Sequence, residues 1–267
     1  MAVSPNSRMI AISKFARRTC RTWYYPVLGS MAALSISAGS PEVALSVPWA
    51  ELFQQGAQVV QLYRISDRDE VELGKQINQQ LLSTQFQPVR DRALNDKVNR
   101  IGQKLAQTSS RPDIPYTFQV VKDKSINAFA TAGGFVYVTT GLLEAVDNEA
   151  QLAGVLAHEI GHIAARHTVE QMRQTAIAQG LANAAGVDRN KVIALGVELG
   201  VRRPRSRQAE FEADRLGFEN MQRAGYDRNQ MIAFIEKLRN QSSIPAFLST
   251  HPATSDRIAR LQGNEDD

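Results

Sequence analysis

The stretch Asn148–His167 reads NEAQLAGVLAHEIGHIAARH and has the motif HEIGH, residues 158–162, near its centre. On a helix, residues four apart lie about 40° apart around the axis and one turn along it, and so share a face. His158 and His162 therefore point the same way and can offer two ring nitrogens to one metal ion. Glu159 lies close enough to act on a water there without being a ligand. The pattern is that of H-E-x-x-H zinc hydrolases.

The residues around the motif predict a helix buried in a core. Apolar side chains follow helical spacing, and small residues between them allow close packing. These are Leu152, Val155, Leu156, Ile160 and Ile163, with Gly154 and Gly161 among the small ones. Two histidines and a glutamate in such a helix need compensation, because unpaired buried charge is costly. A bound metal ion would provide it.

The composition indicates one globular domain behind a leader. The chain has 267 residues, 43% hydrophobic and 22% charged. Residues 1–46 account for the whole formal net charge of +4, and the remainder is formally neutral. Nucleic-acid binding needs a basic patch on the folded domain, so none is expected. The single cysteine, Cys20, lies in the leader, which excludes a cysteine nucleophile or a cysteine zinc site elsewhere.

The leader has the order of a secretory signal peptide. A basic start precedes the uncharged residues 22–41, and Ala44-Leu45-Ser46 places small residues before a possible cleavage point. The alternative is an uncleaved membrane anchor, because about 20 residues span a bilayer. In both cases the rest of the chain is expected outside the cytoplasm, periplasmic or anchored facing the periplasm.

The predicted domains are a leader at 1–46, a linker at 47–67, a catalytic domain at 68–263 and an acidic tail at 264–267. Within them, short β-rich runs predict strands at 116–122, 126–130 and 135–139. Helices are predicted from Ser66 to about 84, along the stripe Leu94–Leu105, and at 148–167, 168–184, 189–201, 206–224, 228–240 and around Ile258 and Leu261. A loop holding His251 is predicted between Pro245 and Pro252, and a solvated turn at 202–205. The predicted fold class is α+β, mostly helical, with a small sheet beside the active-site helix.

A third metal ligand is needed, because catalytic zinc usually takes three from the protein. His167 would lie about 140° from His162 on a continuing helix, so it is predicted to miss the ion. Glu210 is predicted to be the ligand. Asp214, one helical turn on, is predicted to receive the free ring N–H of a bound histidine and fix its tautomer. Glu212 is predicted to point away.

Several separated motifs resemble the HtpX-, BepA- and CAAX-prenyl-protease-like gluzincin metallopeptidases. They are the central stretch, EFEAD at 210–214, NAFA at 127–130 with GGFVYV at 133–138, and Thr250-His251-Pro252 followed by Arg257. The resemblance spans roughly 68–263. The chain lacks the multiple membrane spans of the first and last branches and the tetratricopeptide array of the BepA-like branch. It is expected to be a minimal exported protease domain.

The resemblance implies one zinc per chain, held by His158, His162 and Glu210, with Glu159 as general base. It implies an endopeptidase that acts on unfolded or misassembled exported or membrane proteins in quality control. Strand 135–139 is expected to pair with an extended substrate as a sheet edge. The predicted substrate-binding residues are Asn127, Gly133, Gly134, Phe135, Val136 and Tyr137.

His251 has two competing predicted roles. It is either a donor to the oxyanion of the reaction intermediate, or a fourth metal ligand that keeps the enzyme latent by closing the open position. The latch is preferred here, on the resemblance to the BepA-like branch. The alternative to an enzyme is a non-catalytic, metal-stabilised periplasmic chaperone or scaffold, which the presence of Glu159 disfavours.

Overall fold

Helix α5 (Glu149–Ala164) carries the HEIGH motif and begins at the N-cap Asn148, whose side chain accepts a hydrogen bond from Gln151 N. Every residue from Gln151 to Ile163 is buried. A helix with no exposed face belongs in the interior of a domain. The prediction of a buried helix is therefore confirmed.

The computed structural model describes residues 65–178, 189–201, 205–252 and 255–263. All of them fall within one compact unit, Ser46–Asp267. The predicted leader, most of the linker and the acidic tail lie outside the described residues. So do the end of the helix predicted at 168–184 and most of the predicted solvated turn.

The three predicted strands are confirmed and form one sheet in the order β1–β3–β2. They are β1 (Thr117–Val121), β2 (Ala128–Ala130) and β3 (Phe135–Thr139). Strand β3 runs parallel to β1 and antiparallel to β2. Its backbone is paired on both sides, so β3 is the central strand and β2 is an edge.

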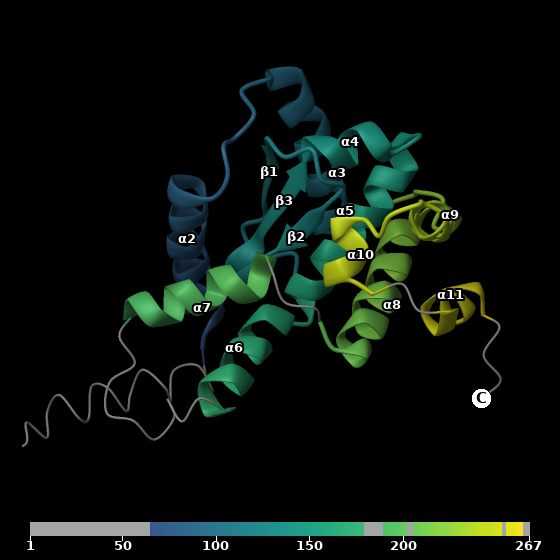
Figure 1. The fold of residues 1–267 in the computed structure, drawn as a ribbon. Coiled ribbons are helices and arrows are strands. Elements are labelled where there is room, and N and C mark those ends of the chain that lie inside the picture. Colours follow the sequence, from purple (N-terminus) through teal and green to yellow (C-terminus); the bar gives the residue numbers. More distant parts are fainter. Residues whose placement is uncertain (1–64, 179–188, 202–204, 253–254, 264–267) are drawn as a thin grey trace, which may run out of the picture. The chain divides into compact units, whose positions relative to one another are not determined.

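Helices cover both faces of the sheet (Figure 1). Side chains of α3 (Arg92–Gln107) and α5 share a core cluster with Val136 and Val138 of β3. Side chains of α2 (Asp67–Thr84) and α7 (Arg189–Val201) share another with Phe135 and Tyr137. The alternation follows from the two-residue period of a strand. Since both faces are covered, every residue of β3 is buried.

The predicted helix start at Ser66 is confirmed, and side-chain caps begin both α2 and α3. The Ser66 side chain accepts from Asp69 N at the start of α2. The Asp91 side chain accepts from Leu94 N at the start of α3. The remaining described helices are η1 (Ala132–Gly134), α4 (Thr140–Ala145), α6 (His167–Ala178), α8 (Arg207–Arg223), α9 (Asn229–Arg239), α10 (Ala246–Thr250) and α11 (Ser255–Gln262).

The prediction of a plain loop around His251 is wrong. The segment holds α10, which starts after Pro245 and has His251 as its C-cap. Proline is well tolerated at a helix start, because the missing N–H has no helical partner there. The Phe247 N–H donates to Ile126 O at 2.9 Å, which ties α10 to the chain just before β2.

Glycines allow α5 and α8 to approach closely. A Cβ at Gly161 would lie 2.6 Å from Ala213 O, and one at Gly217 would lie 3.0 Å from Ala157 O. The first distance is too short for any Cβ, and the second is tighter than ordinary packing, so both contacts favour glycine. The close crossing places the HEIGH motif directly against the first half of α8.

Among the described residues, no helix combines the length and apolar character needed to cross a bilayer.

Candidate metal centre

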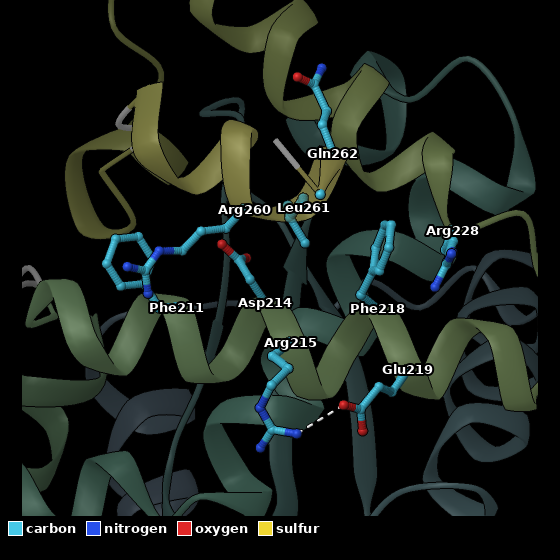
Figure 2. A pocket seen from close by; sticks show the side chains of 10 residues that line it. Phe211, Asp214, Arg215, Phe218, Glu219, Arg228, Arg260, Leu261 and Gln262 are labelled. Atoms are coloured by element: carbon cyan, nitrogen blue, oxygen red, sulfur yellow. Dashed lines mark hydrogen bonds and ion pairs between the residues drawn. The ribbon is translucent and has the colours of Figure 1, made fainter. Parts of the chain in front are cut away.

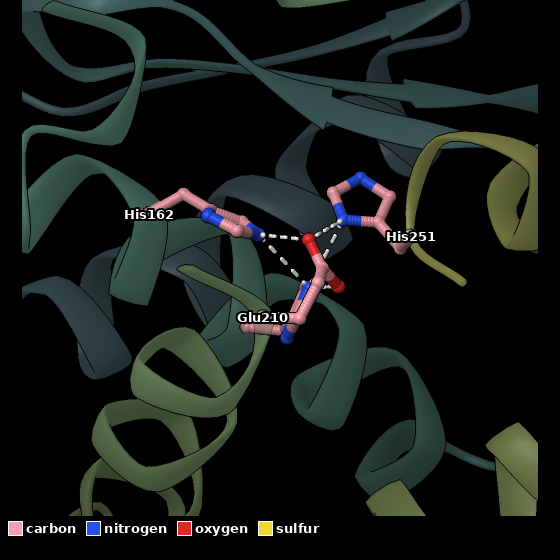
Figure 3. A group of neighbouring side chains, drawn as sticks. His162, Glu210 and His251 are labelled. Carbon is pink, nitrogen blue, oxygen red and sulfur yellow. Dashed lines mark hydrogen bonds and ion pairs between the residues drawn. The ribbon is translucent and has the colours of Figure 1, made fainter. Parts of the chain in front are cut away.

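The predicted ligands converge on one buried point. One donor atom from each of His158, His162, Glu210 and His251 lies within 4.8 Å of the others. His158 Nε2 lies 3.1 Å from His162 Nε2 and 3.1 Å from His251 Nδ1. Glu210 Oε1 lies 3.3 Å from His162 Nε2 and 3.2 Å from His251 Nδ1. Figure 3 shows the Glu210 carboxylate between His162 and His251.

The four residues come from three parts of the chain. His158 and His162 lie one turn apart on α5, as the motif spacing predicts. Glu210 lies in the first turn of α8, whose N-cap Ser206 accepts from Ala209 N. All four residues are at most 2% exposed. The convergence that the sequence predicted for the first three is observed, and His251 joins them.

An aspartate behind the ligands fixes the tautomer of His158. Asp214 Oδ1 lies 2.9 Å from His158 Nδ1. Burial raises the pKa of Asp214, but hydrogen bonds and charge from Arg257 outweigh it and leave the pKa below its usual value. The carboxylate is therefore ionised and accepts the Nδ1–H of His158. His158 Nε2, which faces His162 Nε2 at 3.1 Å, is then the atom that holds either a proton or a metal ion.

Lone pairs converging in a buried place fit a cation. Two imidazole nitrogens 3.1 Å apart beside a carboxylate repel unless a proton or metal ion lies among them. Burial lowers the pKa of His158, but its hydrogen bond to Asp214 and its interactions with Glu210 raise it to about 9. Carboxylate partners of this kind make an imidazole a more basic ligand. The residues present therefore fit a metal that takes nitrogen and oxygen ligands.

Arg257 holds the outer side of the cluster. Its Nε and Nη2 donate to Asp214 at 2.7 and 2.8 Å, and its Nη1 lies 2.8 Å from Glu210 Oε2. Nη1 also donates to the carbonyls of His251 and Pro252. One buried guanidinium thus binds Glu210 and Asp214 of α8 and the backbone that carries His251.

Glu159 has the environment of a reactive group. Its side chain is fully buried, and neither carboxylate oxygen has a hydrogen-bond partner among the described residues. His251 Nε2 lies 3.4 Å from Oε1, without hydrogen-bond geometry. Buried polar groups are normally paired, and exceptions point to a catalytic role or a missing solvent partner.

His167 is not among the clustered donor atoms, as predicted. It contacts His162 on the side of the ring that faces away from the cluster. The two Nδ1 atoms are 2.8 Å apart. On its other side, His167 Nε2 lies 3.2 Å from Glu212 Oε2. Glu212 points away from the four clustered donor atoms, as predicted, and is half exposed, but it reaches His167. The helix does not continue through 165–167, since Arg166 adopts a left-handed φ of 58°, and the sequence gives no sign of this.

The prediction that strand 135–139 is a sheet edge that pairs with the substrate is wrong. Strand β3 has β1 on one side and β2 on the other, so its backbone has no free pairing position. The side chains of Phe135 and Tyr137 point into the core shared with α2, and Tyr137 Oη donates to Asn78 Oδ1 at 2.8 Å. Val136 packs in the core cluster that includes α5.

The glycines at 133 and 134 serve packing within the chain. Both have positive φ, 76° and 95°. A Cβ at Gly133 would lie 2.7 Å from Glu70 O of α2, and one at Gly134 would lie 2.8 Å from Ile114 Cγ2. The backbone that approaches them is the protein's own. Asn127 differs from these glycines, because its Oδ1 is buried without a hydrogen-bond partner among the described residues.

Arg205 was expected in a solvated turn, yet it is 6% exposed. Its Nη2 donates to Ala130 O of the edge strand at 3.1 Å, and its Nη1 donates to Gln171 Oε1 at 3.4 Å. Its backbone N–H donates to Thr250 O. Burial lowers its pKa. Charge runs are usually solvated, so no sequence signal separates this arginine from its neighbours.

A hollow with a volume of about 490 Å³ lies between α8 and α11 (Figure 2). Phe211, Phe218 and Arg260 line it, and Arg260 stacks over Phe211 at 3.9 Å. Asp214 also borders it, but none of the four metal-facing residues does. This hollow is therefore not the catalytic site.

An HExxH helix that meets a distant glutamate at one buried point is the arrangement of zincin-like metallopeptidases. Residues 92–265 match Peptidase family M48, and the chain belongs to that family. The expected membership and fold class are thereby confirmed.

Two relatives from different organisms show how far the similarity extends. The chain is 33% identical over 188 residues to the beta-barrel assembly-enhancing protease of Escherichia coli (strain K12), covering 64% of this chain and 39% of the relative. It is 31% identical over 172 residues to the mitochondrial metalloendopeptidase OMA1 of Schizosaccharomyces pombe, covering 62% and 51%. The chain thus spans about 40% to half of the length of these relatives.

Proposed function

We propose that the protein is a zinc-dependent endopeptidase. The observation that carries the proposal is the convergence of His158, His162 and Glu210 beside the unpartnered carboxylate of Glu159. Two imidazoles and a carboxylate are a ligand set of catalytic zinc. Family membership supports the same reaction class.

The residues divide the chemistry between them. Zinc held by His158, His162 and Glu210 would polarise the scissile carbonyl and lower the pKa of a water. Glu159 takes a proton from the attacking water and delivers it to the leaving amine. Its lack of other partners leaves both oxygens available for this transfer. Asp214 and Arg257 keep the ligands oriented.

The substrate is proposed to pair with β2 rather than β3. In the β2–β3 ladder, Thr139 N donates to Asn127 O and Thr131 N donates to Phe135 O. In an antiparallel pair, successive residues turn their backbone groups to opposite sides, so Ala128 and Ala130 face away from β3. Extended peptides bind sheet edges by backbone pairing. On this side Arg205 Nη2 already donates to Ala130 O at 3.1 Å, and β2 is buried, so a substrate strand has to displace this arginine to pair here. Asn127 at the start of this edge remains a proposed substrate contact through its amide.

His251 is proposed to be a latch that keeps the enzyme latent. Its Nδ1 lies among the ligand atoms, and the whole cluster is buried, so a substrate carbonyl needs a displacement to enter. His251→Ala should then raise the cleavage rate of an unfolded substrate while zinc is retained. A loss on the order of 100-fold would instead assign His251 the oxyanion role. An unchanged rate would leave it a structural residue.

The natural substrates are proposed to be unfolded or misassembled exported or membrane proteins. One relative is named for β-barrel assembly, which supports this substrate class. The exported, periplasmic location and any membrane association depend on residues 1–46 and stay predictions. A pull-down with Glu159→Gln, which should bind substrate without cutting it, would identify what the protein acts on.

Metal content and cleavage test the function together. The purified protein should hold one zinc per chain and cleave casein, and a chelator should stop cleavage until zinc is restored. Glu210→Ala should lose both properties, whereas Glu219→Ala, a half-exposed acid on the same helix, should keep both. Binding of unfolded chains without any cleavage, unchanged by Glu159→Gln, would favour the chaperone or scaffold.

A further inference from the structure

We propose that His167 and Glu212 are positioning residues for the metal ligand His162. This inference rests on the proposed metal site. The three side chains form a continuous line, from His162 Nδ1 to His167 Nδ1 at 2.8 Å and from His167 Nε2 to Glu212 Oε2 at 3.2 Å. The line starts at a fully buried ligand and ends at a half-exposed carboxylate.

The line admits one arrangement of protons. If His162 binds the metal through Nε2, which faces the cluster, its Nδ1 carries the hydrogen and donates it. His167 Nδ1 must then be the acceptor, so the hydrogen of a neutral His167 is on Nε2. That hydrogen points at Glu212, which accepts it. The next residue outward thus sets the tautomer of each histidine, as partners of metal-bound histidines commonly do.

A sharp turn between α5 and α6 places His167 next to His162. Helix α5 ends at Ala164, Arg166 turns the chain with its left-handed φ, and α6 begins at His167. An arginine in this conformation needs outside support. Arg166 receives it, because Nη2 donates to Ile65 O at 2.7 Å and Nε lies 3.0 Å from Glu70 Oε2.

The two histidine ligands are therefore supported in different ways. His158 has the direct carboxylate of Asp214, which is buried and paired with Arg257. His162 reaches its carboxylate through one intervening imidazole, and that carboxylate is in contact with solvent. We expect Asp214 to affect zinc affinity more strongly than Glu212 does.

Zinc affinity of purified protein, measured by competition with a chelator, tests the positioning role. His167→Asn keeps an acceptor near the Nδ1 position but loses volume, whereas His167→Phe keeps volume and loses the acceptor. Removal of an outer partner typically costs about 10–100-fold in affinity, and we expect that loss for His167→Phe. His167→Asn should lose less than half as much on a logarithmic scale. Glu212→Ala should lose a few-fold, and Glu219→Ala nothing.

The thermal stability of the chelator-treated variants separates positioning from packing. If His167 only fills space, zinc affinity will follow stability, and His167→Phe will bind better than His167→Asn. That order, or wild-type affinity in both variants, overturns the proposal. A wild type that binds no zinc overturns it together with the proposed function. A wild type that binds zinc but cleaves nothing, with the expected order of affinities, overturns the peptidase alone.

Discussion

Two buried glutamates, Glu70 and Glu159, lie in the same domain in opposite surroundings. Glu70 of α2 is 1% exposed, and its carboxylate meets Arg111 Nη2 and Arg166 Nε, each at 3.0 Å, and the N–H of Gly133. Glu159 of α5 is equally buried, yet neither of its oxygens has a hydrogen-bond partner among the described residues. One carboxylate is matched by this chain's own groups and the other is not.

The difference separates a structural acid from the one proposed to react. Glu70 of α2 connects three other segments through Gly133, Arg111 and Arg166. Arg111 also donates to Ile163 O near the end of α5. A buried charge that is fully paired supports the fold and has no capacity left for chemistry. An unpaired one weakens the fold unless a substrate or solvent supplies the partner.

The largest expected effect is on Glu159→Gln, which should lower peptide cleavage by about 10²–10⁴-fold. The amide cannot take a proton from the attacking water. Zinc content should not change, and the free energy of unfolding should stay equal or rise, because an unpaired buried charge is removed. Cleavage assays, metal analysis and urea unfolding check these three outcomes. Retained cleavage would remove Glu159 from the mechanism.

Glu70→Gln should lower the free energy of unfolding, in contrast to Glu159→Gln. Removing the carboxylate leaves Arg111 and Arg166 with Asp67, which is largely exposed, as their remaining shared carboxylate. Breaking a fully buried pair costs roughly 3–5 kcal/mol, and we expect about 2–3 kcal/mol here because both arginines keep contact with solvent. Urea unfolding measures the loss. Glu72→Gln, an exposed acid of the same helix, should stay within about 0.5 kcal/mol of the wild type.

Asp214→Asn lies between the two cases, because Asp214 orients a ligand and also pairs with a buried arginine. Zinc affinity should fall by about 10–100-fold, and stability should fall because Arg257 loses Asp214 as a charged partner and keeps Glu210. Chelator competition and urea unfolding report the two effects separately. If affinity and stability both match the wild type, Asp214 has no part in the site.

The local part of this site could be predicted from the sequence. Residues four apart on one helix share a face whatever surrounds them, which is why His158 and His162, and then Glu210 and Asp214, could be assigned. Two features depend on long-range packing and could not. Nothing local to 135–139 shows that β1 and β2 pair with it on both sides. The position of His167 depends on a left-handed Arg166, and arginine has no preference for that conformation.

The order in which the ligands occur along the chain has a consequence for folding. His158 and His251 are 93 residues apart, and Glu210 and His251 are 41 apart. Closing such separations costs chain entropy before any contact offsets it. The complete site therefore forms only after α5, α8 and α10 have docked, and metal uptake reports that step. A hydrolase built in this way has no active centre while its own chain is still unfolded.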